Sequence, residues 1–176
     1  MYNVTFTNIQ MSTRYYDPSW WGLAEPIYIS ACPRNNSIKV GSVNGVHFVN
    51  ITATSENGIF LSGSKDSLLN GIQFTNFTLK LVKSTTFFGG YHDYRPGCQG
   101  LVLHRMSGVF MEYIEDVLLQ NLDIHWKEEA HLSDWGLPFD FTPSTVYNMK
   151  LVEFVQTYGK SSRADSYLDD RSQSNG

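Results

Sequence analysis

A nine-residue phrase that recurs along the chain constrains the fold more than any other feature of this sequence. Near-copies read NVTFTNIQM from residue 3, GVHFVNITA from residue 45 and GIQFTNFTL from residue 71. A fourth copy has Val117 as its first apolar residue, and a weaker fifth has Met149. The shortest spacing, 26 residues between Val46 and Ile72, is typical of the units of repeat proteins. The longer spacings predict loops inserted at 12–25, 84–100 and 127–136.

Within each copy the apolar residues change face halfway along. Val46 and Phe48 alternate with polar residues, as in a half-buried strand, but the next apolar residues are Ile51 and Ala53. A bend with one residue in the left-handed conformation would keep both pairs on the buried side, and asparagine tolerates that conformation. The sequence therefore predicts a column of bend asparagines whose stacked amides can hydrogen-bond to one another: Asn8, Asn50, Asn76 and Asn121.

A short apolar segment follows each of four copies: PIYIS from 26, GIFLSG from 58, GVFMEY from 108 and LPFDF from 137. Units of several short strands each favour an all-β parallel β-helix, with a cap where the fifth copy carries Glu153 in place of asparagine. An antiparallel sandwich or barrel also has short strands at regular spacing, but it does not require one bend residue at the same place in four copies. We expect β-helix rungs over residues 1–158 and a disordered polar tail over 159–176.

Composition excludes several classes of protein. There are 13 Lys and Arg residues against 17 Asp and Glu residues, with no basic run, which argues against a nucleic-acid partner. No apolar run has the length of a membrane span, and no signal peptide precedes the first repeat. Cys32 and Cys98 can form one disulfide or remain as two thiols. The histidines lack the spacing of metal ligands, so neither a metal nor another cofactor is expected.

Residues 43–81 resemble the C-terminal half of plant polygalacturonases, the family 28 glycoside hydrolases. A V-x-x-x-N-I phrase, a small polar cluster and a G-I-x-L-x-x-V phrase follow one another there in the same order. AEPIYISACPRN at 24–35 is similar to that family's P-I-I-I-D-Q segment. YYDPSWWG, HDYRPGCQG and PSTV, from residues 15, 92 and 143, resemble a divergent plant branch called pectin lyase-like proteins.

The resemblance extends over residues 1–155 and implies a right-handed parallel β-helix, of which this chain would hold only the C-terminal rungs. It also implies hydrolysis of α-1,4-linked galacturonic acid in pectin, secretion or a cell-wall location, and a protein that is monomeric when complete. The expected partner is a pectic polysaccharide, with neither nucleic acid nor membrane involved.

The catalytic signatures of that family are absent from this chain. Inverting hydrolysis needs a general acid and a general base, which the family places in N-T-D, D-D, G-H-G and R-I-K signatures. SIKVG at 37 lacks the arginine, GGYHDY at 89 is not G-H-G, and the only adjacent aspartates, Asp169 and Asp170, lie in the expected tail. The family's R-I-K signature ends just before a rung that reads like YNVTFTNI. We therefore expect the chain to begin after the last catalytic motif, and we assign no catalytic residue.

Three loops carry side chains suited to a sugar. Trp20 and Trp21, with Tyr15, Tyr16 and Asp17 nearby, can stack on sugar rings or fold back as a lid over the core. His92, Asp93 and Arg95, with Tyr94 between them and Arg34 as a companion, can bind a uronate carboxylate or form an internally hydrogen-bonded loop. The third group is Asp134, Trp135 and Asp140, where Asp140 alternates with Phe139 and Phe141 and is expected to face outward without a catalytic role.

Four asparagines match the N-glycosylation pattern: Asn3, Asn35, Asn50 and Asn76. A glycan on Asn50 or Asn76 would disrupt the predicted amide stack, so we predict Asn35, in a loop, as the site to be modified.

Three hypotheses for the function follow from the sequence. The chain is the inactive C-terminal segment of a polygalacturonase-like enzyme, or a non-catalytic β-solenoid that binds polysaccharide or plays a structural role. The third hypothesis is a truncated gene product that does not fold stably.

Overall fold

The computed structural model describes residues 1–33, 35, 37–94, 98, 100–127 and 137–159, and over these residues it is all-β. The only helical element among them is one turn of 3-10 helix, Pro143–Thr145. Of the tail expected at 159–176, only Gly159 is described, and its N–H donates to Trp126 O at 2.6 Å; residues 160–176 and the loop 128–136 lie outside the described residues. No helix in the described part of the chain is long and apolar enough to cross a membrane.

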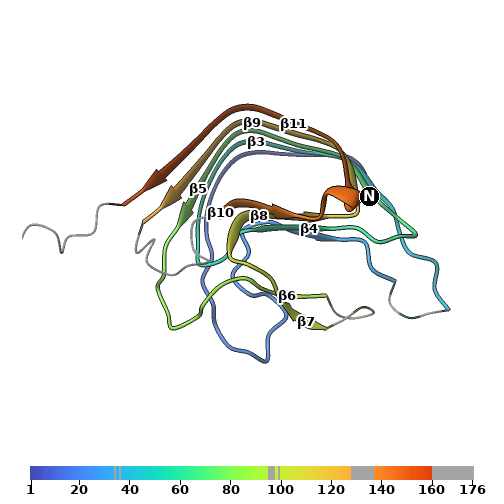
Figure 1. Cartoon of the computed structure of the whole chain (residues 1–176), viewed down its shortest axis with the longest axis horizontal. Coiled ribbons are helices and arrows are strands. Elements are labelled where there is room, and N and C mark those ends of the chain that lie inside the picture. Colours follow the sequence, from blue (N-terminus) through green and yellow to red (C-terminus); the bar gives the residue numbers. More distant parts are fainter. Residues whose placement is uncertain (34, 36, 95–97, 99, 128–136, 160–176) are drawn as a thin grey trace, which may run out of the picture.

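The repeated phrases form the long strands of one parallel sheet, which stack in chain order. These strands are β1 (Tyr2–Ser12), β3 (Val43–Ser55), β5 (Leu69–Leu81), β9 (Ile114–Trp126) and β11 (Val146–Tyr158). Their register follows the repeat, because Val46 of β3 pairs with Val4 of β1 on one side and with Ile72 of β5 on the other. The sheet forms the arched layer in Figure 1.

The short apolar segments form the strands of a second parallel sheet. These are β2 (Tyr28–Ser30), β4 (Ile59–Ser62), β8 (Ser107–Glu112) and β10 (Leu137–Phe141), in the order β2-β4-β8-β10. Figure 1 shows this sheet under the arch of the first, and the apolar side chains that β3, β5 and β9 place between the two layers are buried. Two parallel sheets exclude the antiparallel sandwich and are compatible with a parallel β-helix.

The long strands bend at the predicted asparagines. Asn8, Asn50 and Asn76 have a φ of 55° and Asn121 has a φ of 52°, all in the left-handed region. The bend keeps both halves of each strand on the core, so in β3 Val46, Phe48, Ile51 and Ala53 are all buried.

A second column of left-handed residues lies five positions before the first, at the start of each repeat. Its members are Asn3 (φ 51°), Gly45 (φ 68°), Gly71 (φ 65°), Asp116 (φ 56°) and Asn148 (φ 53°). This column was not predicted from the sequence, because the residue type varies along it, although all its members belong to the few types that tolerate a positive φ. A Cβ at Gly45 would lie 2.6 Å from Asn3 Oδ1, so the Asn3 side chain would have to move if another residue stood there.

The insertion at 84–100, expected as a loop, forms the first strand of a two-stranded antiparallel ribbon, and the second strand follows it directly. Its strands are β6 (Tyr91–Asp93) and β7 (Leu101–Leu103), with Tyr91 paired to Leu103. The ribbon lies against the outer face of the second sheet (Figure 1), where Tyr94 packs on Phe60 and Phe110. A disulfide joins Cys98 of this insertion to Cys32, with their Cα atoms 6.1 Å apart.

Candidate functional site

The loop after β1, residues 15–22, presents three exposed aromatic side chains close together in the sequence, and we call it the tryptophan loop. Tyr16, Trp20 and Trp21 are 75%, 62% and 58% exposed. Tyr16 and Trp20 meet edge to face, with ring centroids 6.2 Å apart. The loop is the blue segment that projects below the sheets in Figure 1. The alternative that the tryptophans fold back as a lid is therefore wrong, because both rings face solvent.

Asp17 holds the tip of the tryptophan loop in shape. Its Oδ1 atom accepts hydrogen bonds from Ser19 N at 2.8 Å and from Ser19 Oγ at 2.6 Å. These bonds lower the pKa of the Asp17 carboxyl below its usual value, the side-chain bond contributing most. They belong to the residue pattern of an Asx turn. The order they impose reduces the entropy that a ligand would have to remove.

Glu56 fixes the base of the tryptophan loop to a second loop. It is 1% exposed, and its carboxylate accepts hydrogen bonds from Tyr15 N at 2.6 Å, Ser84 N at 2.7 Å and Thr85 N at 2.5 Å. Three backbone donors from two loops satisfy a charge that would be costly to bury without partners.

Aromatic contacts continue between the same two loops. The rings of Tyr15 and Phe87 stack at 4.4 Å, and the neighbouring Phe88 is 72% exposed with Lys83 Nζ 5.9 Å above its ring. Arg14 is exposed at the start of the tryptophan loop. The two loops thus combine exposed rings with cationic groups, which suits a ligand with sugar faces and carboxylates.

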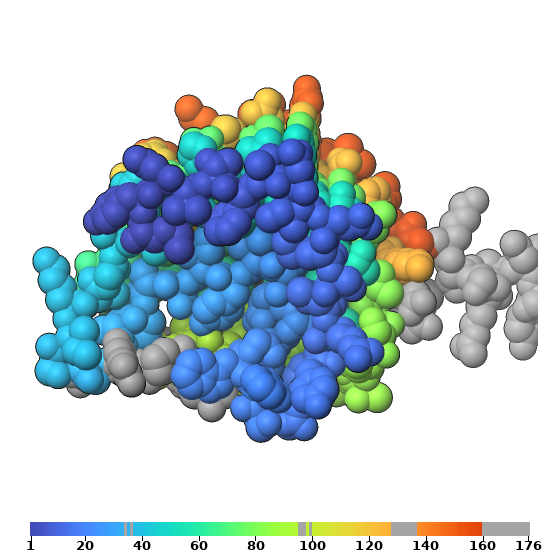
Figure 2. Space-filling model, turned by 180° about the vertical axis from the view of Figure 1, so that it is seen from behind, coloured from blue at the N-terminus to red at the C-terminus, as the bar shows by residue number. Residues whose placement is uncertain are grey.

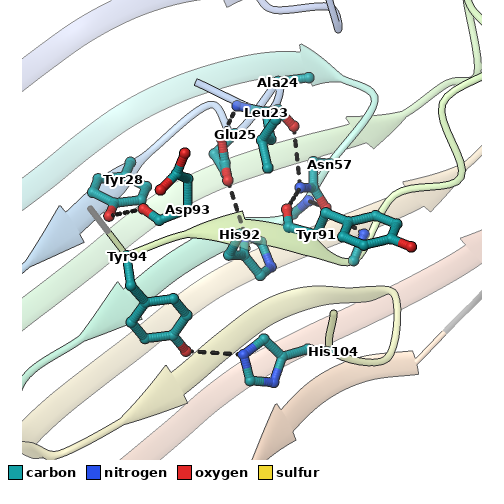
Figure 3. Close-up of polar contacts among 12 residues, drawn as sticks. Leu23, Ala24, Glu25, Tyr28, Asn57, Tyr91, His92, Asp93, Tyr94 and His104 are labelled. Carbon is teal, nitrogen blue, oxygen red and sulfur yellow. Dashed lines mark hydrogen bonds and ion pairs between the residues drawn. The ribbon is translucent and has the colours of Figure 1, made fainter. Parts of the chain in front are cut away.

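The second candidate group, in the ribbon, is buried. His92 and Asp93 are 2% and 3% exposed, and His92 Nδ1 lies 2.8 Å from Glu25 Oε1 (Figure 3). The Asp93 carbonyl accepts a hydrogen bond from Tyr28 Oη at 2.5 Å. Neither side chain is accessible to a polysaccharide, because both are buried between the ribbon and the residues it packs on. The segment is internally hydrogen-bonded, which is the alternative that the sequence left open.

Asn57 links three segments beside the ribbon (Figure 3). Its Nδ2 donates to Leu23 O at 3.1 Å and to Tyr91 O at 2.9 Å, and its Oδ1 accepts from Gly90 N at 3.0 Å. Glu25, Glu56 and Asn57 were not among the residues predicted from the sequence. Glu56 and Asn57 lie with Gly58 in the three-residue connection between β3 and β4, and turns of that length are ordinarily exposed, so nothing in the local sequence marks their burial.

Tyr94 and His104 meet under the ribbon, where Tyr94 Oη lies 2.9 Å from His104 Nε2 (Figure 3). Burial, with the Glu112 carboxylate nearby, raises the pKa of the Tyr94 hydroxyl above its usual value of 10.0. Burial, with the His92 ring nearby, lowers the pKa of His104 below its usual value of 6.5. Both shifts favour the neutral form, so this contact is a neutral hydrogen bond near neutral pH.

Of the remaining candidate residues, one forms a salt bridge and the others lie outside the described residues. Asp140 Oδ1 accepts from Arg105 Nη2 at 2.7 Å, so its carboxylate is engaged in a salt bridge. Arg34, Arg95, Asp134 and Trp135 lie outside the described residues. No group of three or more His, Cys, Asp and Glu side chains in the described part of the chain could hold a metal ion.

The bend asparagines form a hydrogen-bonded ladder across four strands. Nδ2 of each donates to Oδ1 of the asparagine one repeat earlier, at 3.1 Å from Asn50 to Asn8, 2.9 Å from Asn76 to Asn50 and 2.7 Å from Asn121 to Asn76. N-glycans attach at the side-chain nitrogen, which at Asn50 and Asn76 is a ladder donor. Asn35 is exposed and uses its Oδ1 to accept from Ser37 N at 3.0 Å. Its modification stays a prediction.

No family model, no curated protein and no solved structure matches this chain.

Proposed function

We propose that this chain is the C-terminal segment of a polygalacturonase-like, right-handed parallel β-helix, and that the tryptophan loop binds pectic polysaccharide. The exposure of Trp20, Trp21 and Tyr16 on an ordered loop carries the proposal. Large aromatic rings that stay exposed contribute little stabilisation by burial to the fold. A group of such rings on one loop is therefore typical of a site where a ligand covers them. The face of a pyranose ring is apolar and flat, and it suits such a surface.

Several features support the finer parts of this proposal. Parallel strands repeated in chain order suit a β-helix, and crossovers between parallel strands are right-handed in about 98% of cases. The disulfide between Cys32 and Cys98 supports secretion to an oxidising compartment such as the cell wall. Lys83, which lies over the exposed Phe88 ring, and the exposed Arg14 suit the carboxylates of galacturonate.

Affinity electrophoresis in gels that contain polygalacturonic acid tests the binding. We expect the polysaccharide to retard the wild-type chain and the double variant Trp20→Ala, Trp21→Ala to lose most of that retardation. Tyr158→Ala is the matched control, because Tyr158 is 51% exposed on β11, at the opposite edge of the sheet from β1. Unchanged mobility of the wild-type chain in the polysaccharide gel would sink the proposal.

This segment is proposed to bind without hydrolysing the polymer. Glu25 pairs with His92, and Glu56 accepts three backbone hydrogen bonds. Both carboxylates thus stabilise the fold, and we assign neither of them a catalytic role. We expect no release of reducing ends from polygalacturonic acid above a heat-treated control.

A wholly non-catalytic β-solenoid is the alternative to a segment of an enzyme. The two are distinguished by adding the preceding coding sequence: in-frame R-I-K and D-D signatures there, with hydrolysis by the longer protein, would favour the enzyme.

A further inference from the structure

The loop that follows β5, residues 83–88, presents a further exposed ring beside the tryptophan loop, and we call it the phenylalanine loop. Phe88, at its end, is 72% exposed. β5 is the middle strand of the long sheet, with β3 and β9 on either side, so strands that the structure describes fix the start of this loop. In Figure 2 the two loops lie along the lower part of the molecule, the tryptophan loop in blue and the phenylalanine loop in green.

The fold holds the residues on both sides of Phe88. Phe87 stacks on Tyr15 with ring centroids 4.4 Å apart, and its N–H donates to Thr85 Oγ1 at 3.2 Å. On the other side Gly89 is buried at a φ of 78°, and a Cβ there would lie 2.4 Å from Met106 Sδ. Because both neighbours are held, an ordered backbone presents the Phe88 ring to solvent.

Lys83 places a cation beside the exposed ring. Its Nζ atom lies 5.9 Å from the centroid of the Phe88 ring, within the range of a cation–π contact. The next two backbone N–H groups, of Ser84 and Thr85, donate to the buried Glu56 carboxylate, so Lys83 extends from a fixed segment. A ring and a cation side by side suit a uronate residue, which has an apolar face and one carboxylate.

The tryptophan loop combines its rings with a carboxylate instead of a cation. Residues 15–22 include Asp17 and no lysine, arginine or histidine. The Asp17 side chain is charged at neutral pH, and like charges repel. The rings of this loop therefore have no electrostatic reason to select an unesterified uronate over its neutral ester.

We propose that Lys83 and Phe88 form a subsite for an unesterified galacturonate residue of the bound polymer, and that Lys83 determines a preference for unesterified over methyl-esterified pectin. The tryptophan loop contacts the faces of neighbouring sugars whether or not they are esterified. A methyl ester removes the charge that the Lys83 ammonium attracts but leaves the sugar face that the rings cover. This inference rests on the proposed binding of pectic polysaccharide at the tryptophan loop.

Binding of the full chain to immobilised polygalacturonic acid and to its methyl-esterified form tests the preference. We expect the wild-type chain to bind the unesterified polymer more tightly. Lys83→Gln should weaken binding to that polymer about three- to fivefold, as for a partly exposed charge pair, and leave binding to the esterified polymer unchanged. Trp20→Ala with Trp21→Ala should weaken binding to both polymers. At about 1 M salt, where the screening length is about 3 Å, the wild type and Lys83→Gln should bind equally.

Two further lysine variants separate this role from a general effect of charge. Lys83→Arg keeps the cation and should keep the preference. The matched control is Lys65→Gln, which removes the same charge from an exposed lysine that precedes β5, at the opposite end of that strand from Lys83. This control should bind both polymers like the wild type.

The outcomes distinguish the subsite from the proposed function. The subsite is overturned if Lys83→Gln weakens binding to both polymers equally, if Lys65→Gln has the same effect as Lys83→Gln, or if only Arg14→Gln removes the preference. Binding of both polymers by the wild-type chain without any preference would overturn the subsite alone. No binding of either polymer would overturn the proposed function as well.

Discussion

At the scale of the residue, the long strands depend on side chains that tolerate a positive φ. An ordinary L-residue in the left-handed conformation is about 1–2 kcal/mol less stable than in its usual conformation. Asparagine lowers that cost and also adds the amide ladder, whereas Gly45 and Gly71 in the other column lower it by lacking a side chain. Asparagine and glycine thus both allow the positive φ that these strands require, each for a different reason.

Substitutions at Asn76 separate conformation from hydrogen bonding. Asn76→Ala removes the bonds to Asn50 and Asn121 and places alanine at a φ of 55°. We expect it to lower the free energy of unfolding by about 2–3 kcal/mol, the sum of strain and two partly exposed hydrogen bonds. Asn76→Gly keeps the conformational freedom and should lose about 1 kcal/mol less. Urea unfolding measures both, and equal losses in the two variants would contradict the role of the bend.

At the scale of the element, the β6–β7 ribbon is held to the second sheet by buried polar contacts. Glu25, Asn57 and Tyr28 each bind a ribbon residue, and Tyr94 packs under the ribbon on the aromatic cluster. A ribbon of two short strands is not stable alone. Its position therefore depends on these contacts and on the disulfide.

The pKa shifts under the ribbon give stability a dependence on pH. The pKa of His104 is lower in the folded protein than in the unfolded chain. The unfolded chain therefore binds more protons below about pH 6.5, and the free energy of unfolding decreases as the pH is lowered. The pKa of Tyr94 is raised, so stability is also lost as pH rises above about 10.

Urea unfolding as a function of pH measures this dependence. The glutamine of the variant His104→Gln cannot titrate. The variant should therefore show a smaller decrease in the free energy of unfolding at acid pH, and the same decrease as the wild type above about pH 10. An unchanged decrease at acid pH in this variant would assign the loss of stability to other groups.

At the scale of the whole molecule, the strands stack in the order of the chain, and one disulfide links two segments that are distant in the sequence. The disulfide closes a sequence separation of 66 residues and ties the loop after β2 to the ribbon insertion. Such a link restricts the unfolded chain more than a short loop would.

Removal of the disulfide is the global test of that restriction. Cys32→Ser with Cys98→Ser should lower the free energy of unfolding by about 4 kcal/mol on the chain-entropy model. Thermal and urea unfolding of the oxidised wild type, the reduced wild type and the double variant measure the effect. The reduced wild type is the control and should behave like the variant. Equal stability of all three would show that the link contributes little.

The repeat by itself determined the long strands, their bends and the short second strands. Local chemistry fixes these features: the alternation of apolar residues gives the strand, and Asn8, Asn50, Asn76 and Asn121 mark where it must turn. The parallel direction was also predictable, because antiparallel pairing would not keep the bends in phase.

Only the tertiary structure decided which polar residues are buried and which aromatic residues are exposed. His92 and Trp20 both lie in insertions, and nothing in their local sequence distinguishes a segment packed on a sheet from one that projects into solvent. Glu25 stabilises the buried His92 from 67 residues away, and Glu56 orders the base of the tryptophan loop from across 41 residues. These pairings depend on how the strands and the insertions pack together, so the periodicity of the sequence does not encode them.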